Sequence, residues 1–91
     1  MENSTSVANA WEVGGVAFPE GTEFRGNSKG YYYHAKVLNK ALVLNNRAFL
    51  TPSAAAVSIT RHPVDGWLFW EYKFPDQSSW QSLAQFKNTT R

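Results

Sequence analysis

Residues 51–60 read TPSAAAVSIT, and residues 66–70 read GWLFW. Thr51 can cap a helix, and Pro52 suits the first helical position, where its missing N–H costs nothing. The three alanines at 54–56 allow a neighbouring element to come very close, and the two tryptophans of the second stretch supply bulk to fill the remaining space. The sequence therefore predicts a short helix over residues 52–60 that packs against an aromatic strand.

Four short strands are expected before this helix. Alternating apolar and polar residues, separated by turn residues that tolerate positive φ, are typical of an antiparallel meander. The expected strands cover residues 23–25, 31–38, 41–44 and 47–50. On the longest strand the side chains alternate between an expected core face, Tyr31, Tyr33, Ala35 and Val37, and an opposite face, Tyr32, His34, Lys36 and Leu38.

A fifth strand and a second helix are expected after the first helix. Pro63 cannot continue that helix, and Asp65-Gly66 is a turn signal. The fifth strand is expected over residues 67–74, with its core face made by Leu68, Trp70, Tyr72 and Phe74. The final helix is expected over residues 80–87, with its inward side made by Trp80, Leu83, Ala84 and Phe86. The predicted fold is a small α+β domain, an antiparallel β-meander of four to five strands with one short helix after the fourth strand and a short C-terminal helix.

The length and composition suit one small domain, since the chain has 91 residues of which 43% are hydrophobic and 15% aromatic. It has no cysteine, which excludes disulfides and thiolate metal sites, and its N-terminus lacks the basic start and apolar stretch of a signal peptide. No segment approaches membrane-spanning length. We expect a cytoplasmic protein with a flexible leader over residues 1–17, from which Trp11 can dock, and a single domain over residues 18–91.

The charges are unevenly distributed along the chain. The segment from residue 24 to residue 64 has no acidic residue, and it contains two histidines, His34 and His62, and six cations, Arg25, Lys29, Lys36, Lys40, Arg47 and Arg61. Such a segment is typical of a phosphate-binding surface. The alternative is that these cations only keep the sheet soluble and protect its edges from pairing.

Several of these stretches together resemble the RAMA domain, a module associated with restriction-enzyme adenine methylases and found beside nucleases in bacteria and phages. The resemblance runs from about Pro19 to Phe74 and rests on PEGTEF at 19–24, KG at 29–30, YHAKV at 33–37, LVLN at 42–45, Phe49, PSAAA at 52–56 and GWLFW at 66–70. It implies a non-catalytic DNA-reading accessory domain with modified, methylated adenine as the proposed target. Family members usually carry Gly and Asn near the positions of Arg61 and Asp65, so this turn is expected to differ in shape or charge.

We expect five cations to share one basic surface that contacts duplex phosphates: Arg25, Lys29, Lys36, Arg47 and Arg61. Tyr32 and His34 lie at its expected edge, and the turn from Arg61 through His62 to Gly66 is expected closest to the groove. Asp65 would repel phosphate and is therefore expected to face the amino group of a base.

Two aromatic residues have alternative interpretations. Tyr32 either stacks on a base or serves only the β propensity of its strand. Trp67 either covers the triple-alanine helix or lines a pocket beside Asp65 that could hold an unstacked or modified base.

Nothing in the sequence indicates catalysis. Two histidines twenty-eight residues apart, with no cysteine, make no recognisable metal site, and no phosphate-loop or nucleophile-elbow spacing exists. We expect no enzyme activity, no cofactor and no metal. The leading hypothesis is a module that binds DNA, and the alternative is a protein-interaction module that docks on a methyltransferase or nuclease or forms a homodimer.

Overall fold

The computed structural model describes residues 9–87, so residues 1–8 of the expected leader and residues 88–91 lie outside the described residues. Six strands form one antiparallel sheet in the order β6-β5-β4-β3-β7-β8. Their bounds are β3 (Glu23–Ser28), β4 (Tyr31–Leu38), β5 (Ala41–Leu44), β6 (Arg47–Phe49), β7 (Trp70–Lys73) and β8 (Gln81–Ser82). A separate hairpin is made by β1 (Trp11–Val13) and β2 (Val16–Phe18), and the helices are α2 (Pro52–Thr60), α3 (Gly66–Phe69) and α4 (Ala84–Lys87).

The predicted α+β class is confirmed, and so is the meander from β3 to β6. The described residues contain more strands than expected because β1, β2 and β8 are only two or three residues long. Such strands are too short to show a period in the sequence. β7 does not continue the meander beside β6, but pairs with the opposite edge of β3, where Gly26 lies against Trp70.

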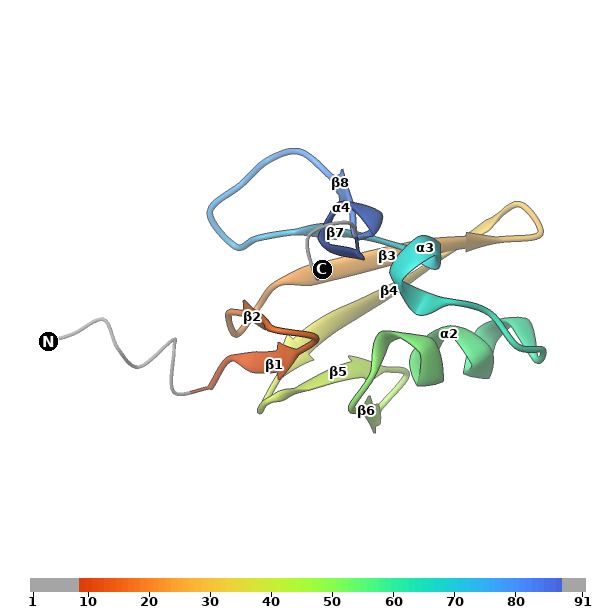
Figure 1. Cartoon of the computed structure of the whole chain (residues 1–91), viewed down its shortest axis with the longest axis horizontal. Coiled ribbons are helices and arrows are strands. Elements are labelled where there is room, and N and C mark those ends of the chain that lie inside the picture. Colours follow the sequence, from red (N-terminus) through yellow and green to blue (C-terminus); the bar gives the residue numbers. More distant parts are fainter. Residues whose placement is uncertain (1–8, 88–91) are drawn as a thin grey trace, which may run out of the picture.

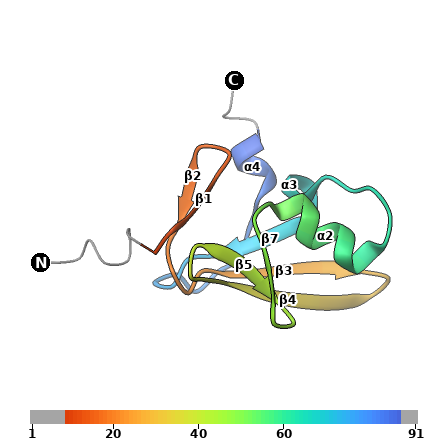
Figure 2. The same cartoon turned by 90° about the horizontal axis from the view of Figure 1, so that it is seen from below.

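The three helices and the β1–β2 hairpin all lie on one side of the six-stranded sheet (Figures 1 and 2). Figure 2 shows them above β3 and β4, with no helix below these strands. We call the side under the helices the covered face and the other side the bare face. The two faces differ in environment, because only the covered face is shielded from water and can form a core.

The predicted helix α2 is confirmed together with its caps. The hydroxyl oxygen of Thr51 accepts a hydrogen bond from the backbone N–H of Ala54 at 3.1 Å, and Pro52 occupies the first turn. At the other end Arg61 takes a left-handed conformation with φ of 67°, and its N–H donates to the carbonyl of Val57 at 2.8 Å. These local bonds explain why a nine-residue helix with little amphipathic character is well defined at both ends.

The prediction of one strand over residues 67–74 is wrong. Its first half is the short helix α3, because a carboxylate oxygen of Asp65 accepts from the N–H of Trp67 at 3.0 Å and so caps a helical turn. The N–H of Gly66 donates to the hydroxyl of Ser53 at 2.8 Å, which ties α3 to the start of α2. The strand β7 begins only at Trp70. Leu68, expected in the core, is therefore 62% exposed.

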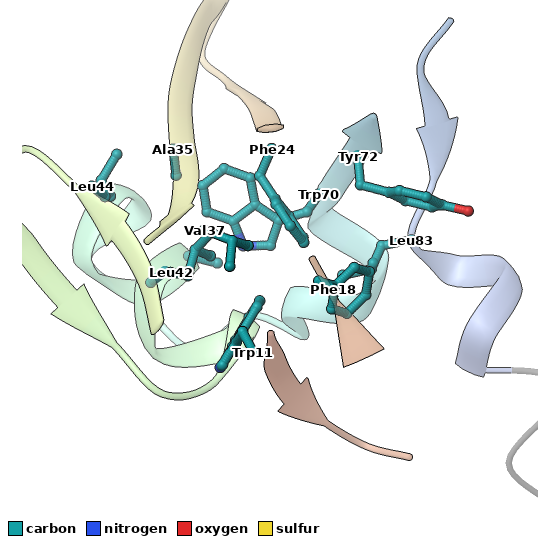
Figure 3. Close-up of a cluster of buried hydrophobic side chains, with 12 residues drawn as sticks. Trp11, Phe18, Phe24, Ala35, Val37, Leu42, Leu44, Trp70, Tyr72 and Leu83 are labelled. Atoms are coloured by element: carbon teal, nitrogen blue, oxygen red, sulfur yellow. The ribbon is translucent and has the colours of Figure 1, made fainter. Parts of the chain in front are cut away.

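Aromatic rings dominate the core on the covered face (Figure 3). Phe24 packs edge-on against Phe18 and Trp70, with ring centroids 5.3 and 6.1 Å away. The N–H groups of the two buried indoles are both satisfied by backbone carbonyls beside the start of α2. Trp11 donates to Leu50 at 3.1 Å, and Trp70 donates to Pro52 at 2.9 Å. Each indole thus fills the core and fixes the position of α2 as well.

The expected leader over residues 1–17 is too long, because its second half belongs to the fold. Trp11 is only 2% exposed and Phe18 is fully buried, so the β1–β2 hairpin closes one end of the core. The expectation that Trp11 docks on the domain is confirmed.

The expected C-terminal helix over residues 80–87 is shorter than predicted. Residues 81 and 82 pair with β7 as strand β8, and α4 begins at Ala84. Leu83 is fully buried as expected. Trp80 is not turned inward, but lies over Arg25 and Lys73 of the bare face. The indole gains cation–π contacts there that depend on residues distant in the sequence.

The expected core face of β4 is confirmed at Ala35 and Val37 but not at its start, where Tyr31 is 71% exposed. β3 and β4 continue as a hairpin to Ser28 and Tyr31, whereas β7 stops opposite Gly26. The hairpin tip therefore extends past the packed layer, and side chains there stay in water whichever way they point.

Candidate nucleic-acid interface

The prediction that the five cations share one surface is wrong. In an antiparallel pair, residues opposite each other project to the same side of the sheet. Arg47 lies opposite Leu44, which is buried on the covered face. Arg25 lies opposite His34 on the bare face, one position from the buried Phe24, and Lys36 shares this face. The alternation along each strand separates the cations into two groups, which a one-dimensional charge count could not show.

Arg47 and Arg61 together border a groove of about 420 Å³ between β6 and α2. The rest of the groove is lined by Phe49, Ala54, Val57 and Ser58. The guanidinium of Arg47 lies 5.2 Å from the centre of the Phe49 ring. Within residues 9–87, no carboxylate lies within ion-pair distance of Arg47 or Arg61. We call this site the arginine groove, and its two cations keep their full attraction for an anion.

Two further predicted residues, Lys29 and His62, lie outside the arginine groove. Lys29, at φ of 54°, forms the tip of the β3–β4 hairpin, and His62 follows the C-terminal end of α2. Both of these segments point toward the same end of the molecule, away from the β1–β2 hairpin (Figures 1 and 2). Both residues are exposed. Lys29 and the two arginines of the groove are thus accessible to a large polyanion.

The cations of the bare face are largely neutralised or stacked. Arg25 donates to a carboxylate oxygen of Glu71 at 2.7 Å, and Lys73 lies 3.7 Å from Glu23. The guanidinium of Arg25 also lies between two rings, 5.0 Å from the centre of Tyr32 and 4.5 Å from that of Trp80. Arg25 is therefore not an unpaired phosphate ligand as expected.

Tyr32 and His34 do project from the bare face, as predicted. Tyr32 is 56% exposed, and His34 is exposed beside Trp80, with ring centroids 6.4 Å apart. Lys36 completes the exposed row along β4. The structure brings together aromatic rings and cations here, which is the arrangement expected of a base-stacking surface.

Asp65 has a structural role in place of the expected contact with a base. One carboxylate oxygen accepts from the N–H of Trp67 at 3.0 Å, and the other accepts from the ammonium of Lys87 at 2.7 Å. The hydrogen bond from Lys87 and, to a smaller extent, that from Trp67 lower the pKa of Asp65, against the opposing effect of desolvation. With both oxygens engaged, this carboxylate holds α3 and α4 in place.

Trp67 packs against the core, in agreement with the first of its two interpretations. Its six-membered ring lies over Gly14 in the β1–β2 turn, where an added Cβ would come within 2.6 Å of the ring. Gly14 also has φ of 59°, so glycine meets both a conformational and a steric need there.

Three residues of the bare face were missed as candidates: Glu71, Lys73 and Trp80. The first two lie in the expected fifth strand outside its core face, and the third is on the expected inward side of the final helix. Only the pairing of β7 with β3 brings Glu71 opposite Arg25. The sequence does indicate where Glu71 and Lys73 point, because charged residues that alternate with Trp70 and Tyr72 along a strand must point away from the core.

The described residues contain no group of three or more His, Cys, Asp or Glu side chains placed to hold a metal ion. Within the same residues, no helix has the length and apolar character needed to cross a membrane. No protein-family model, curated protein or solved structure matches this chain.

Proposed function

We propose that this chain is a non-catalytic DNA-binding module of the RAMA type, which acts as a regulator or as the targeting part of a restriction, modification or defence system. The observation that carries the proposal is the arginine groove. Two arginines on neighbouring elements, with no carboxylate partner within residues 9–87, suit the oxygens of a phosphate backbone.

The surroundings of the groove support a polyanion over a small anion. The chain from residue 24 to residue 64 has no acidic residue, so α2 and the strands β4 to β6 add no repulsion of their own. The tip of the β3–β4 hairpin, which carries Lys29, and the C-terminal end of α2 point toward the same end of the molecule, so Lys29 extends the positive surface past the groove. A duplex with phosphates spaced along its backbone can contact several of these groups at once.

The test is fluorescence anisotropy with a labelled duplex over a series of salt concentrations. Replacing Arg47 and Arg61 together by alanine is expected to weaken binding to all duplex sequences and to lower the salt slope by up to about two units. The matched control replaces Lys36 and Lys73, which removes the same net charge from the bare face and is expected to leave most of the duplex affinity. Equal losses of duplex affinity in the two double variants would mean that binding depends only on net charge, and would contradict the proposal.

A protein-interaction module that docks on a methyltransferase or nuclease is the second candidate. It is favoured by Leu50, which is 72% exposed just before α2, and by Val57, which is 37% exposed in the arginine groove. The same experiment separates the two functions. Docking on a protein predicts no retention of DNA at low salt, whereas phosphate contact predicts strong retention that falls steeply with salt.

A further inference from the structure

A cavity of about 350 Å³ opens at the edge of β3, where the sheet is incomplete. β7 pairs with β3 only as far as Gly26, whereas β4 continues to pair with β3 as far as Ser28. Beyond this point the chain of α3 turns away from the sheet. The space that β7 leaves is bordered by Arg25, Asn27, Tyr32, Phe69 and Glu71. It lies on the other side of β3 from β6, the strand that borders the arginine groove.

The charges in this cavity do not favour a phosphate. The guanidinium of Arg25 is already bound to the carboxylate of Glu71 at 2.7 Å. An added anion would compete with this carboxylate and meet its repulsion. The pair instead presents N–H donors and a carboxylate acceptor side by side, and the amide of Asn27, an exposed residue, adds one more donor and acceptor. Such a set suits a neutral, planar group that carries both kinds of hydrogen-bonding atom.

The walls of the cavity are also suited to a flat ring. The exposed ring of Tyr32 lines it, and so does Arg25, whose guanidinium is already covered by the rings of Tyr32 and Trp80 at 5.0 and 4.5 Å. Phe69 lies against Gly26, where a Cβ would clash with its ring, so the absence of a side chain there lets the aromatic wall form. Aromatic rings such as that of Tyr32 are surfaces on which unpaired bases stack.

From this cavity we infer that the domain binds one unpaired nucleobase at the edge of β3, stacked on Tyr32, with its polar edge bonded to Arg25 and Glu71. The carboxylate favours a base with an exocyclic amino group, that is adenine, cytosine or guanine, over thymine, which has none. The inference deepens the proposed DNA-binding function, on which it rests. The arginine groove would hold the phosphate backbone, and the cavity would take a base that is extruded from a duplex or already single-stranded.

The test uses four labelled duplexes of the same sequence: one fully paired, and three with one extra position that is an unpaired cytosine, an unpaired thymine or an abasic site. A single-stranded oligonucleotide is the fifth probe. The wild-type protein is expected to bind the cytosine bulge about tenfold more tightly than the paired duplex, since stacking one base contributes that much or more. The affinity for the thymine bulge should lie between those for the cytosine bulge and the paired duplex. The affinity for the abasic bulge should equal that for the paired duplex.

The variants assign the effect to the cavity. Tyr32→Ala is expected to lose the preference for the bulge, and Tyr32→Phe to keep it, because the phenyl ring still stacks. Tyr31→Ala is the matched control, since Tyr31 is an exposed neighbour that does not line the cavity. Thermal unfolding of each variant checks that the fold is retained. Equal binding of bulged, abasic and paired duplexes, or an equal loss in Tyr31→Ala, would overturn the inference.

The outcomes for the two sites are separable. Duplex binding that depends on Arg47 and Arg61 without any preference for a bulge would overturn the cavity and leave the proposed function. Binding of the single strand that depends on Tyr32, without duplex binding, would support the cavity and contradict the arginine groove as a duplex site. Failure to bind any of the five probes at low salt would overturn both.

Discussion

The covered and bare faces of the sheet arise from the same strands but differ in how their side chains find partners. On β4, Ala35 and Val37 point into the core, whereas Tyr32, His34 and Lys36 point into water from alternate positions. The covered face is held by ring packing and two buried indole hydrogen bonds. The bare face is held by ion pairs and cation–π contacts that water can reach. The stability of this domain therefore comes mainly from one side of the sheet, which leaves the other side free for recognition.

The largest expected effect tests the covered face. Trp70→Ala should cost about 3–5 kcal/mol, because Trp70 is only 1% exposed and the change also leaves the carbonyl of Pro52 without its partner at 2.9 Å. Urea unfolding followed by circular dichroism measures the loss. Leu68→Ala is the control on the same chain segment, and it should change stability by no more than about 0.5 kcal/mol because Leu68 is 62% exposed. Similar losses in both variants would contradict the assigned faces.

A smaller effect is expected where α2 meets the core. Ala55 is fully buried, so Ala55→Leu should overpack the interface and destabilise the domain by about 1–3 kcal/mol. Ala54→Leu provides the comparison, because Ala54 is exposed on the same helix. The melting temperature should fall for the first variant only. If it fell for both, the leucine itself and not its position on the helix would be responsible.

On the bare face the expected energies are below those of the core. A double-mutant cycle that replaces Arg25 and Glu71 by alanine, singly and together, should give a coupling of up to about 1 kcal/mol, since both side chains are partly exposed. Urea unfolding at two salt concentrations provides the measurement, and the coupling should decrease at the higher one. A coupling as large as the loss in Trp70→Ala would mean that the bare face supports the fold as much as the core does.

The smallest expected effect concerns Asp65, which links α3 to α4. Since the pKa of Asp65 is lowered by folding, its contribution to stability is present above the unfolded pKa of about 3.8 and is lost as the pH falls through the lower, folded value. The stability difference between wild type and Asp65→Asn should therefore be largest near neutral pH and shrink below about pH 4. Melting temperatures between pH 2 and 7 measure it. A difference that stays constant over this range would exclude a titrating role for the carboxylate.

The parts of the fold that were predictable are those set by neighbours in the sequence. Thr51 and Pro52 specify the start of α2. The alternation of residues 31–38 predicts β4 and correctly assigns Ala35 and Val37 to its core face. The conversion of residues 66–69 into α3 was missed because it depends on Asp65 as a cap and on Ser53, thirteen residues away. Large apolar side chains at every second position from Leu68 to Phe74 favour a strand, and the cap outweighs this preference over residues 66–69.

The candidate site was predictable only in its composition. The absence of carboxylates between residues 24 and 64 correctly indicates accessible cations, but their division between two faces depends on which residues oppose buried ones. The position of Trp80 could not be predicted for the same reason. Its pattern fits an inward helical position, and its place over Arg25 is fixed by contacts across the sheet that no local period encodes.

The indole of Trp11 has a consequence for the order in which the chain folds during its synthesis. Trp11 is made early, but the carbonyl that accepts its hydrogen bond belongs to Leu50, and Trp70, which completes the ring cluster beyond Phe24, is translated later still. The β1–β2 hairpin can pack early on Phe24, but it cannot complete its contacts with the domain until Leu50 has been translated. This contact joins segments far apart in the sequence, and such long-range contacts slow folding.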